Sequence, residues 1–209
     1  MNKLVYLDTE TTGLKPGQIG QLSYIISEGA TLTGKNMYFK VDYVDPDAEK
    51  VTGMGINFYS KASNGVIFAD RAEEIKADLN GATFIAHNAQ FDRNFVDMEF
   101  WRIHQVAGYT DVFDTMIYFR DILKLPGRRG NYKNPKLSEV SEWLNLDNDK
   151  VLQYAKKVYN TSDDVTFHDA RFDTTTMMVC MRVYLEKLNK DFSKGWYNTF
   201  VSGGLRWVS

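Results

Sequence analysis

Cysteine is almost absent from this sequence: Cys180 is the only one among 209 residues. No internal disulfide can form, which favours a reducing, cytoplasmic setting. No apolar run approaches the roughly 18 residues needed to span a bilayer, and the first residues lack a basic segment followed by a longer apolar stretch. Neither a membrane anchor nor a secretion signal is therefore expected. The formal net charge is only −2, so a nucleic-acid partner would have to be held by local patches.

What the sequence does contain is the ordinary makeup of a globular domain. Hydrophobic residues account for 44% and charged residues for 25%, and a chain of this length buries roughly two-thirds of its unfolded surface or more. No repeat, low-complexity tract or break in composition divides it. We therefore expect one domain over residues 1–188. The tail, 189–209, is rich in aromatic residues, so it either docks on the same domain, as we expect, or binds a partner.

Hydrophobic periodicity predicts that strands come first and that later strands alternate with helices. Strands are expected at residues 3–8, 19–27 and 36–43, joined by turns that contain glycine. Residues 44–69 are expected to be mostly loop. Beyond them, the pattern predicts helices over 69–80, 90–104, 114–123, 136–146 and 170–188, with short strands at 83–86 and 110–113. This order is typical of a layered α/β fold.

The first strand ends in a pair of carboxylates. In LVYLDTETTGL, residues 4–14, Asp8 and Glu10 stand one residue apart, and both point to the same side because a strand repeats every two residues. Ligands in open α/β sheets bind at the carboxyl ends of strands. Two such charges repel unless a cation lies between them, and oxygen ligands suit Mg²⁺ or Mn²⁺ rather than zinc. The alternative is a solvated turn, since acidic residues are common in this chain.

A second polar cluster follows the apolar strand in the FIAHNAQFD segment. Asp92 lies there in the first turn of a predicted helix. It either complements the helix dipole or faces the same crevice as the first two carboxylates. In the latter case His87 and Asn88 would line the approach.

A third cluster opens the late helix, in VTFHDARFDTTTMMVCM. His168 and Asp173 stand five residues apart, which on a continuous helix is a rotation of about 140°. Both can reach one site only if His168 lies on the loop that enters the helix and Asp173 lies inside it. The alternative for His168 is a surface or capping histidine, and Asp169 fits a solvated or N-capping role.

Taken in order, DTETTGL at 8–14, HNAQFD at 87–92 and HDARFD at 168–173 resemble the motifs of the DEDDh, or DnaQ-like, superfamily of 3′–5′ exonucleases. VTGM resembles the segment where many members carry a His-Gly or Thr-Gly pair, and FDTM and KLSEVSEWLNL resemble the segments that follow. The resemblance covers residues 4 to about 185. It implies a ribonuclease H-like α/β fold, with a mixed five-stranded sheet of three antiparallel strands and then two parallel ones, flanked by helices.

The resemblance also implies a metal site and a base. Asp8, Glu10, Asp92 and Asp173 would hold two Mg²⁺ or Mn²⁺ ions, and His168 would be the general base. Asp8 would be shared, Glu10 and Asp173 would complete the site of one ion, and Asp92 would hold the other. Four uncompensated carboxylates in one crevice would repel one another, whereas two divalent ions neutralise them. Imidazole, with an unperturbed pKa near 6.5, suits proton transfer at neutral pH.

By the same resemblance, several residues would contact the 3′-terminal nucleotide. They are Thr11, Thr12, Gly13, Leu14, His87, Asn88 and Phe91. The alternatives are plain core for Leu14 and Phe91 and a turn role for Asn88.

The implied function is a metal-dependent 3′–5′ exonuclease that releases nucleoside 5′-monophosphates from single-stranded or frayed DNA. RNA trimming by the same chemistry is an alternative, and so is a non-catalytic nucleic-acid-binding or replisome-assembly module. The intact acidic set argues against the latter, because a binding-only protein gains nothing from four mutually repelling acids. An active proofreading subunit with a replication or repair partner is a further possibility.

A basic segment stands apart from these motifs. LPGRRGNYKNPK, residues 125–136, concentrates Arg128, Arg129, Lys133 and Lys136 around glycine and proline. It is either a solvated connector or a mobile basic arm that touches phosphate.

Overall fold

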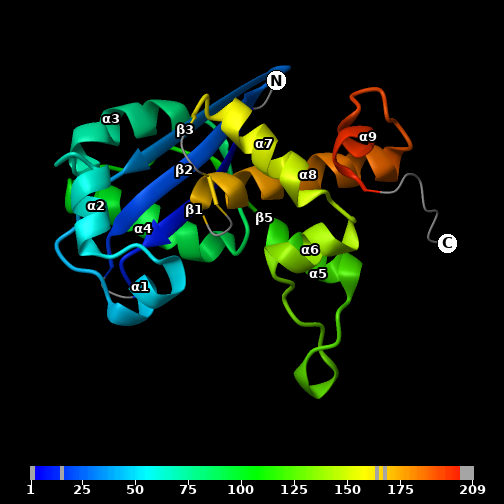
Figure 1. The fold of residues 1–209 in the computed structure, drawn as a ribbon, viewed down its shortest axis with the longest axis horizontal. Helices are drawn as coiled ribbons and strands as arrows, with labels where there is room; N and C mark the ends of the chain where they lie inside the picture. Colours follow the sequence, from blue (N-terminus) through cyan, green and yellow to red (C-terminus); the bar gives the residue numbers. More distant parts are fainter. Residues whose placement is uncertain (1–2, 15–16, 163–164, 167–168, 203–209) are drawn as a thin grey trace.

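The computed structural model describes residues 3–14, 17–162, 165–166 and 169–202. Its centre is a five-stranded sheet in the order β3-β2-β1-β4-β5 (Figure 1). The strands are β1 (Leu4–Thr11), β2 (Ile19–Glu28), β3 (Thr31–Tyr38), β4 (Thr83–Ala86) and β5 (Asp111–Asp114). β1 pairs antiparallel with β2 and β2 with β3, whereas β4 is parallel to both β1 and β5. The expected ribonuclease H-like arrangement is confirmed.

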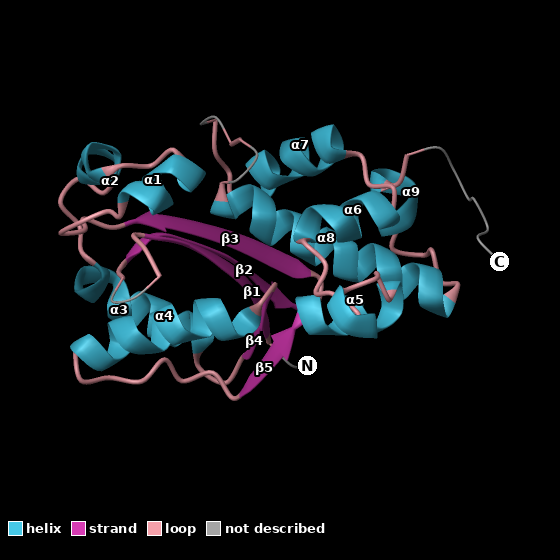
Figure 2. Ribbon diagram, turned by 90° about the horizontal axis from the view of Figure 1, so that it is seen from below, coloured by secondary structure: helices cyan, strands magenta, loops and turns pink. Residues whose placement is uncertain are grey.

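Helices cover both faces of the sheet (Figure 2). They are α1 (Pro46–Thr52), α2 (Ile56–Ala62), α3 (Phe68–Leu79), α4 (Ala89–Arg102), α5 (Thr115–Leu123), α6 (Leu137–Trp143), α7 (Asn148–Val158), α8 (Ala170–Asn189) and α9 (Trp196–Phe200), with a short 3₁₀ turn, η1 (Arg128–Gly130). One core layer packs α3 and α4 against the sheet, and the other packs α5 to α8 against it. Within the described residues, no helix combines the length and the apolar character needed to cross a membrane.

The alternation of side chains along β1 determines how the sheet places its carboxylates. Val5 and Leu7 belong to the core layer of α3 and α4, whereas Tyr6 belongs to the layer of α8. Because successive strand residues point to opposite faces, Asp8 and Glu10 continue on the side of α8. Thr9, between them, points towards α4.

The third strand begins earlier than predicted. The sequence pattern indicated residues 36–43, whereas β3 pairs Thr31 with Glu28 and ends at Tyr38. The strand lies at the edge of the sheet, and none of its side chains is fully buried, so it carries little apolar signal. Phe39 and Val41, just beyond it, are buried, and their apolar character shifted the prediction towards them.

Four helices, α1, α2, α7 and α9, were not predicted. The expectation of loop over 44–69 is wrong, because α1 and α2 form there. The side chain of Asp45 caps α1, Pro46 is its first residue, and Gly53 ends it in the left-handed conformation with φ 72°. These are ordinary start and stop signals that lie outside an apolar periodicity. α7 was missed as well, although Asp147 caps it in the same way.

The last described segment folds back onto α8. Glu186 accepts hydrogen bonds from the backbone amides of Trp196 (3.2 Å) and Tyr197 (2.9 Å). Tyr197 and Phe200 are buried in the same core layer as α8. The aromatic side chains of α9 are therefore largely withdrawn from solvent.

Candidate active site

Three carboxylates meet where β1 ends. Asp8 and Glu10 reach the α8 face of the sheet, and Asp173 lies in the first turn of α8. One carboxylate oxygen from each residue lies within 4.8 Å of the other two, and all three residues are half-buried. A strand near the start of the chain and a helix near its end thus supply one acidic cluster.

Asp92 approaches the same strand from its other side. It lies in the first turn of α4 and is only 3% exposed. Its Oδ1 accepts hydrogen bonds from the backbone amide of Thr9 (3.0 Å) and from the Thr9 hydroxyl (2.8 Å). Since α4 and α8 cover opposite faces of the sheet, Asp92 and Asp173 reach Asp8 from opposite sides. Asp92 is not part of the 4.8 Å group, yet among the neighbouring charges it has the largest effect on Asp8.

Crowding and burial disfavour the charged forms of these groups. Burial, followed by the charges of Asp92 and Asp173, raises the pKa of Asp8 well above its usual range. Burial and then Asp173 raise the pKa of Glu10 to about 8. Burial also raises the pKa of Asp92 to about 7, against the lowering effect of its hydrogen bonds from Thr9.

The cluster has the donors that a hard divalent cation requires. The side chains of Asp8 and Glu10 make no hydrogen bond or ion pair with any residue that the structure describes. Carboxylate oxygens at this spacing suit Mg²⁺ or Mn²⁺. A cation held there would favour the ionised form of each acid and so reverse the raised pKa values. The residues therefore fit the expected metal.

A cavity of about 470 Å³ opens beside Glu10, between the end of β1, α1 and α4. Of the residues expected to contact substrate, it is lined by Thr11, Gly13, Leu14 and Phe91. Leu14 and Val51 of α1 are 78% and 80% exposed, which places two bare apolar side chains at its mouth. α1 is held against the strand end because the amide of Asp45 donates to the carbonyl of Thr12 (2.7 Å).

The other expected substrate residues have protein partners and do not line this cavity. The Thr12 hydroxyl accepts a hydrogen bond from the amide of Gln18 (2.9 Å). Asn88 adopts the left-handed conformation with φ 75°, and its amide donates to Asp114 (3.2 Å). His87 contacts the Thr115 hydroxyl and the Pro135 carbonyl, each at 3.0 Å. These contacts shape the turn between β4 and α4.

The expected general base, His168, lies outside the described residues. α8, which carries Asp173, begins at Ala170, two residues after His168. The intervening Asp169 is the N-cap of α8 and is buried, and its side chain accepts a hydrogen bond from the amide of Arg171 (2.8 Å). Of the two roles expected for Asp169, capping is confirmed.

Sequence reasoning missed a buried ion pair beside the acids. Arg171 is 5% exposed and contacts Asp169 through Nη2 and Oδ2 at 2.6 Å. Gln21 of β2 also donates to Asp169 (3.1 Å). An Asp-x-Arg sequence at a helix start carries no signal of burial, because such charges are usually exposed.

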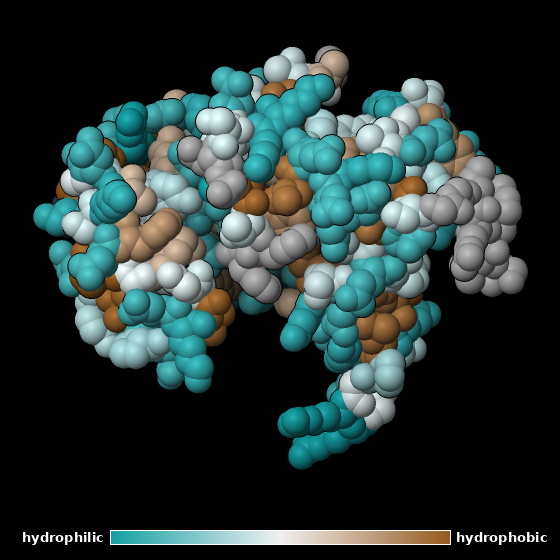
Figure 3. All heavy atoms as spheres, in the orientation of Figure 1, coloured by the Kyte–Doolittle hydropathy of each residue, from teal (hydrophilic) through white to brown (hydrophobic). Residues whose placement is uncertain are grey.

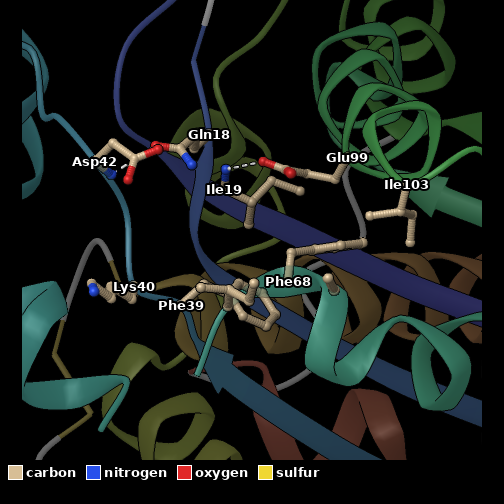
Figure 4. A pocket seen from close by; sticks show the side chains of 10 residues that line it. Gln18, Ile19, Phe39, Lys40, Asp42, Phe68, Glu99 and Ile103 are labelled. Carbon is tan, nitrogen blue, oxygen red and sulfur yellow. Dashed lines mark hydrogen bonds between the residues drawn. The ribbon is translucent and has the colours of Figure 1, made fainter. Parts of the chain in front are cut away.

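A second cavity, of about 280 Å³, is lined by none of the four acids (Figure 4). Two of its polar side chains are hydrogen-bonded within the protein: Glu99 accepts hydrogen bonds from the amide of Ile19 (3.0 Å) and from Arg102 (2.7 Å), and Gln18 accepts one from the amide of Asp42 (2.8 Å). Among the described residues, the one group of three or more possible metal ligands lies elsewhere, at the end of β1. The acidic cluster at the end of β1 therefore remains the candidate site.

A family model agrees with this geometry. The RNase_T exonuclease model matches residues 5–181, a stretch that includes all four acids. The chain belongs to this exonuclease family. The expected resemblance to DnaQ-like exonucleases is thereby confirmed. Membership implies the use of divalent metal ions, and Asp8, Glu10 and Asp173 are a donor set for them.

Several proteins are similar to this exonuclease family member. DNA polymerase III subunit epsilon of Haemophilus influenzae is 34% identical over 164 residues, which cover 71% of this chain and 59% of the relative. The 3′-5′ exonuclease DinG of Bacillus subtilis is 32% identical over 161 residues, which cover 72% of this chain and 16% of DinG. The chain thus spans about three-fifths of the epsilon relative and a small part of DinG.

A solved structure shares the fold. E. coli exonuclease I in complex with a dA16 oligonucleotide superposes with a TM-score of 0.65 at 16% identity, covering 93% of this chain and 43% of that one. At this identity the likeness concerns the fold alone. It agrees with the strand order of the sheet.

Proposed function

We propose that this chain is a divalent-metal-dependent 3′–5′ exonuclease. It hydrolyses the terminal phosphodiester of single-stranded or frayed DNA and releases nucleoside 5′-monophosphates. The observation that carries the proposal is the convergence of Asp8, Glu10 and Asp173 within 4.8 Å, with Asp92 on the other side of β1. The name of the relative DinG, a 3′-5′ exonuclease, supports the reaction class.

The acids divide the metal site between them. Asp8 would be shared by two ions, Glu10 and Asp173 would complete the site of one, and Asp92 would hold the other. Two divalent ions bound here would neutralise the carboxylates and stabilise charge on the attacking and leaving oxygens of an in-line displacement. The chain itself fixes the oxygens, because Asp8 and Glu10 lie within the ladder between β1 and β2 and Thr9 holds Asp92 with two hydrogen bonds.

His168 is the proposed general base for the attacking water. An imidazole side chain, with an ordinary pKa near 6.5, is suited to accept a proton at neutral pH. In the sequence His168 precedes Asp173 by five residues and Ala170, the first residue of α8, by two.

The 3′-terminal nucleotide is proposed to occupy the 470 Å³ cavity beside Glu10, a volume within the usual range of about 300–1,000 Å³ for ligand pockets. Leu14, Val51 and Phe91 offer apolar surface to the base, and the backbone around Gly13 faces the sugar. The strand end that enters between β1 and α1 is proposed to be unpaired. Base stacking there would contribute about 1–3 kcal/mol.

DNA is the proposed substrate, ahead of RNA. The epsilon relative is named as a DNA polymerase subunit, and the exonuclease I structure contains a dA16 oligonucleotide. RNA trimming is the alternative, since discrimination depends on whether a side chain meets the 2′-hydroxyl. Rates measured on matched DNA and RNA oligonucleotides separate the two.

The relatives also suggest a setting for the enzyme. Because the epsilon relative is named as a polymerase subunit, we propose that this chain acts with replication or repair proteins. The domain is proposed to extend over residues 1–188, with the tail docked on it through α9. The burial of Tyr197 and Phe200 against α8 supports that docking.

The proposal is tested by incubating a 5′-labelled single strand with Mg²⁺ or Mn²⁺. We expect products that shorten from the 3′ end and that disappear with EDTA and in Asp8→Asn, because EDTA removes the metal ions and the substitution removes a carboxylate that would hold them. His168→Ala is expected to lower turnover about 10²- to 10⁴-fold while Mn²⁺ binding, measured by calorimetry, changes little.

The matched control is Asp149→Asn, which removes an exposed acid at the start of α7 and should leave the rate unchanged. A strand that is retarded in a gel but never shortened would identify a binding-only module. Equal loss of turnover and metal binding in His168→Ala would make the histidine structural.

A further inference from the structure

The segment between α5 and α6 folds into a small hairpin, residues 125–133, which we call the basic hairpin. Pro126 and Tyr132 form an antiparallel bridge, and the amide of Lys133 donates to the carbonyl of Leu125 (3.0 Å). Gly127 is required by space, since a Cβ there would lie 2.5 Å from the Asn131 carbonyl oxygen. The hairpin is thus a defined structure, although the sequence alone left it as a connector or an arm.

The basic hairpin presents positive charge to solvent. Residues 125–136 contain four basic residues and no acidic one. Arg128 and Arg129, at the tip, are exposed, and neither side chain makes a hydrogen bond or ion pair with any described residue. Lys133 instead pairs with Glu139. Tyr132 is 51% exposed beside the arginines.

The stretch from Asp114 to Pro135 comprises α5 and the basic hairpin, and both of its ends contact the turn before α4. At the start, Asp114 accepts hydrogen bonds from the amides of Asn88 (3.2 Å) and Ala89 (3.0 Å). At the end, the Pro135 carbonyl contacts Nε2 of His87 (3.0 Å). The same turn leads directly into the helix that carries Asp92. The hairpin is therefore connected at both ends to the turn that precedes Asp92.

The link through His87 has a defined polarity. Burial lowers the pKa of His87, so the ring is neutral at pH 7. A carbonyl oxygen only accepts, so Nε2 carries the proton and donates it to Pro135, while Nδ1 contacts the Thr115 hydroxyl, which is also within hydrogen-bond distance of the Ala86 carbonyl (3.2 Å). The ring thus holds the base of the hairpin and has no nitrogen left for a nucleotide.

The hairpin projects from the lower edge of the molecule (Figure 1). In the space-filling view it forms a hydrophilic projection, and the surface is hollowed between it and the part that holds α1 (Figure 3). The tip is six residues from Pro135, which allows a reach of at most about 20 Å. α1, which lines the acidic cavity, lies on the same lower side of the molecule in Figure 1, so a strand that leaves the cavity along this hollow runs towards the hairpin.

We propose that the basic hairpin binds the sugar-phosphate backbone of the substrate strand, on the 5′ side of the nucleotide that is removed. The inference rests on the proposed nuclease function. The acidic cluster cannot attract a polyanion by itself, and the overall charge of −2 gives no general attraction. Arg128 and Arg129 supply unpaired cations where the rest of the strand would lie, and Tyr132 offers a face for base stacking.

The test compares substrates with and without an upstream backbone. Wild type and Arg128→Ala/Arg129→Ala are assayed on a single-stranded oligonucleotide of about 20 nucleotides, long enough to reach the tip, and on a dinucleotide. Removing two phosphate contacts is expected to lower the slope of log KM against log salt for the long substrate by about 1.4. At 0.1 M salt this corresponds to a KM up to about 25-fold higher than that of wild type. The kcat of the long substrate and the KM of the dinucleotide should not change.

Two further variants separate charge from structure. Arg128→Lys/Arg129→Lys keeps both cations and is expected to restore most of the lost affinity. Lys190→Ala/Lys194→Ala removes the same charge from the exposed segment between α8 and α9 and should leave both KM values as in wild type.

The outcomes distinguish the two levels of the proposal. An unchanged KM and salt dependence for the long substrate in the alanine variant overturns the role of the hairpin and leaves the nuclease standing. If the Lys190→Ala/Lys194→Ala control raises the KM for the long substrate equally, the effect comes from overall charge, and the role of the hairpin is overturned as well. If wild type cleaves neither substrate, the nuclease function fails, and the hairpin assignment fails with it.

Discussion

At the scale of single residues, the ion pair of Asp169 and Arg171 governs the start of α8. Arg171 donates to both oxygens of Asp169, with Nε at 2.9 Å from Oδ1 and Nη2 at 2.6 Å from Oδ2. Both residues are less than 10% exposed. The charge of Asp169 also contributes to the raised pKa of Asp8 and Glu10. Arg171 is thus a permanent cation beside a cluster that otherwise contains only acids.

Arg171→Ala is expected to lower the free energy of unfolding by about 3–5 kcal/mol, because it leaves a buried carboxylate without its partner. The measurement is urea denaturation at pH 7 in EDTA. In the Asp169→Ala background the same substitution should cost much less. Additive losses in the double variant would show that the pair is not coupled.

At the scale of elements, α2 and β2 meet at a contact that only glycine permits. Tyr59 of α2 is fully buried, and a Cβ on Gly20 would lie 2.3 Å from its Cζ. Gly20 stands beside Gln21, which pairs with Glu10, at the point where the ladder between β1 and β2 shifts its register. The helix therefore packs flush against the strand that supports the acidic cluster.

Gly20→Ala is expected to destabilise the protein by about 1–3 kcal/mol, since the added methyl overpacks this contact. The shift is measured by chemical denaturation. Tyr59→Leu, which removes the ring, should lower the cost of the glycine substitution. If Gly20→Ala costs the same free energy of unfolding in wild type and in Tyr59→Leu, the contact with the Tyr59 ring is not the source of the destabilisation.

The elements also show what the sequence allowed us to predict. The period of two along a strand predicted that Asp8 and Glu10 point to the same side. Strong apolar patterns predicted β4 and α8. The bounds of β3 were not predicted, because an edge strand with half-buried side chains has no apolar pattern. The approach of Asp92 through Thr9 and the burial of Arg171 depend on which faces α4 and α8 cover. Such contacts arise from packing between distant segments, and no local spacing records them.

At the scale of the whole molecule, the acidic cluster makes the metal-free fold less stable as the pH rises. Carboxyl groups in the unfolded chain titrate near pH 4, whereas the pKa of Glu10 is about 8 and that of Asp92 about 7 in the folded protein. The folded state therefore binds more protons between about pH 4 and pH 8, so the free energy of unfolding falls across that range. The stabilisation is fully present below pH 4 and is lost by about pH 8.

In EDTA, we expect the Tm to be lower at pH 8 than at pH 5.5 and Mg²⁺ to raise it most at pH 8, where the acids are ionised. Thermal denaturation followed by fluorescence provides the measurement. Glu10→Gln should flatten the pH dependence and weaken the response to Mg²⁺. A Tm that rises with pH in EDTA, unaffected by that substitution, would contradict the assignment.

The distribution of the acids along the chain also bears on synthesis. Asp8 and Asp92 leave the ribosome early, but Asp173 and the helix that covers β1 and β2 leave it late. A nascent chain lacks the last ligand until the segment from β1 to the start of α8 has been translated. In the proposed enzyme, degradation of nucleic acid near the ribosome is thus delayed until α8 has emerged and docked.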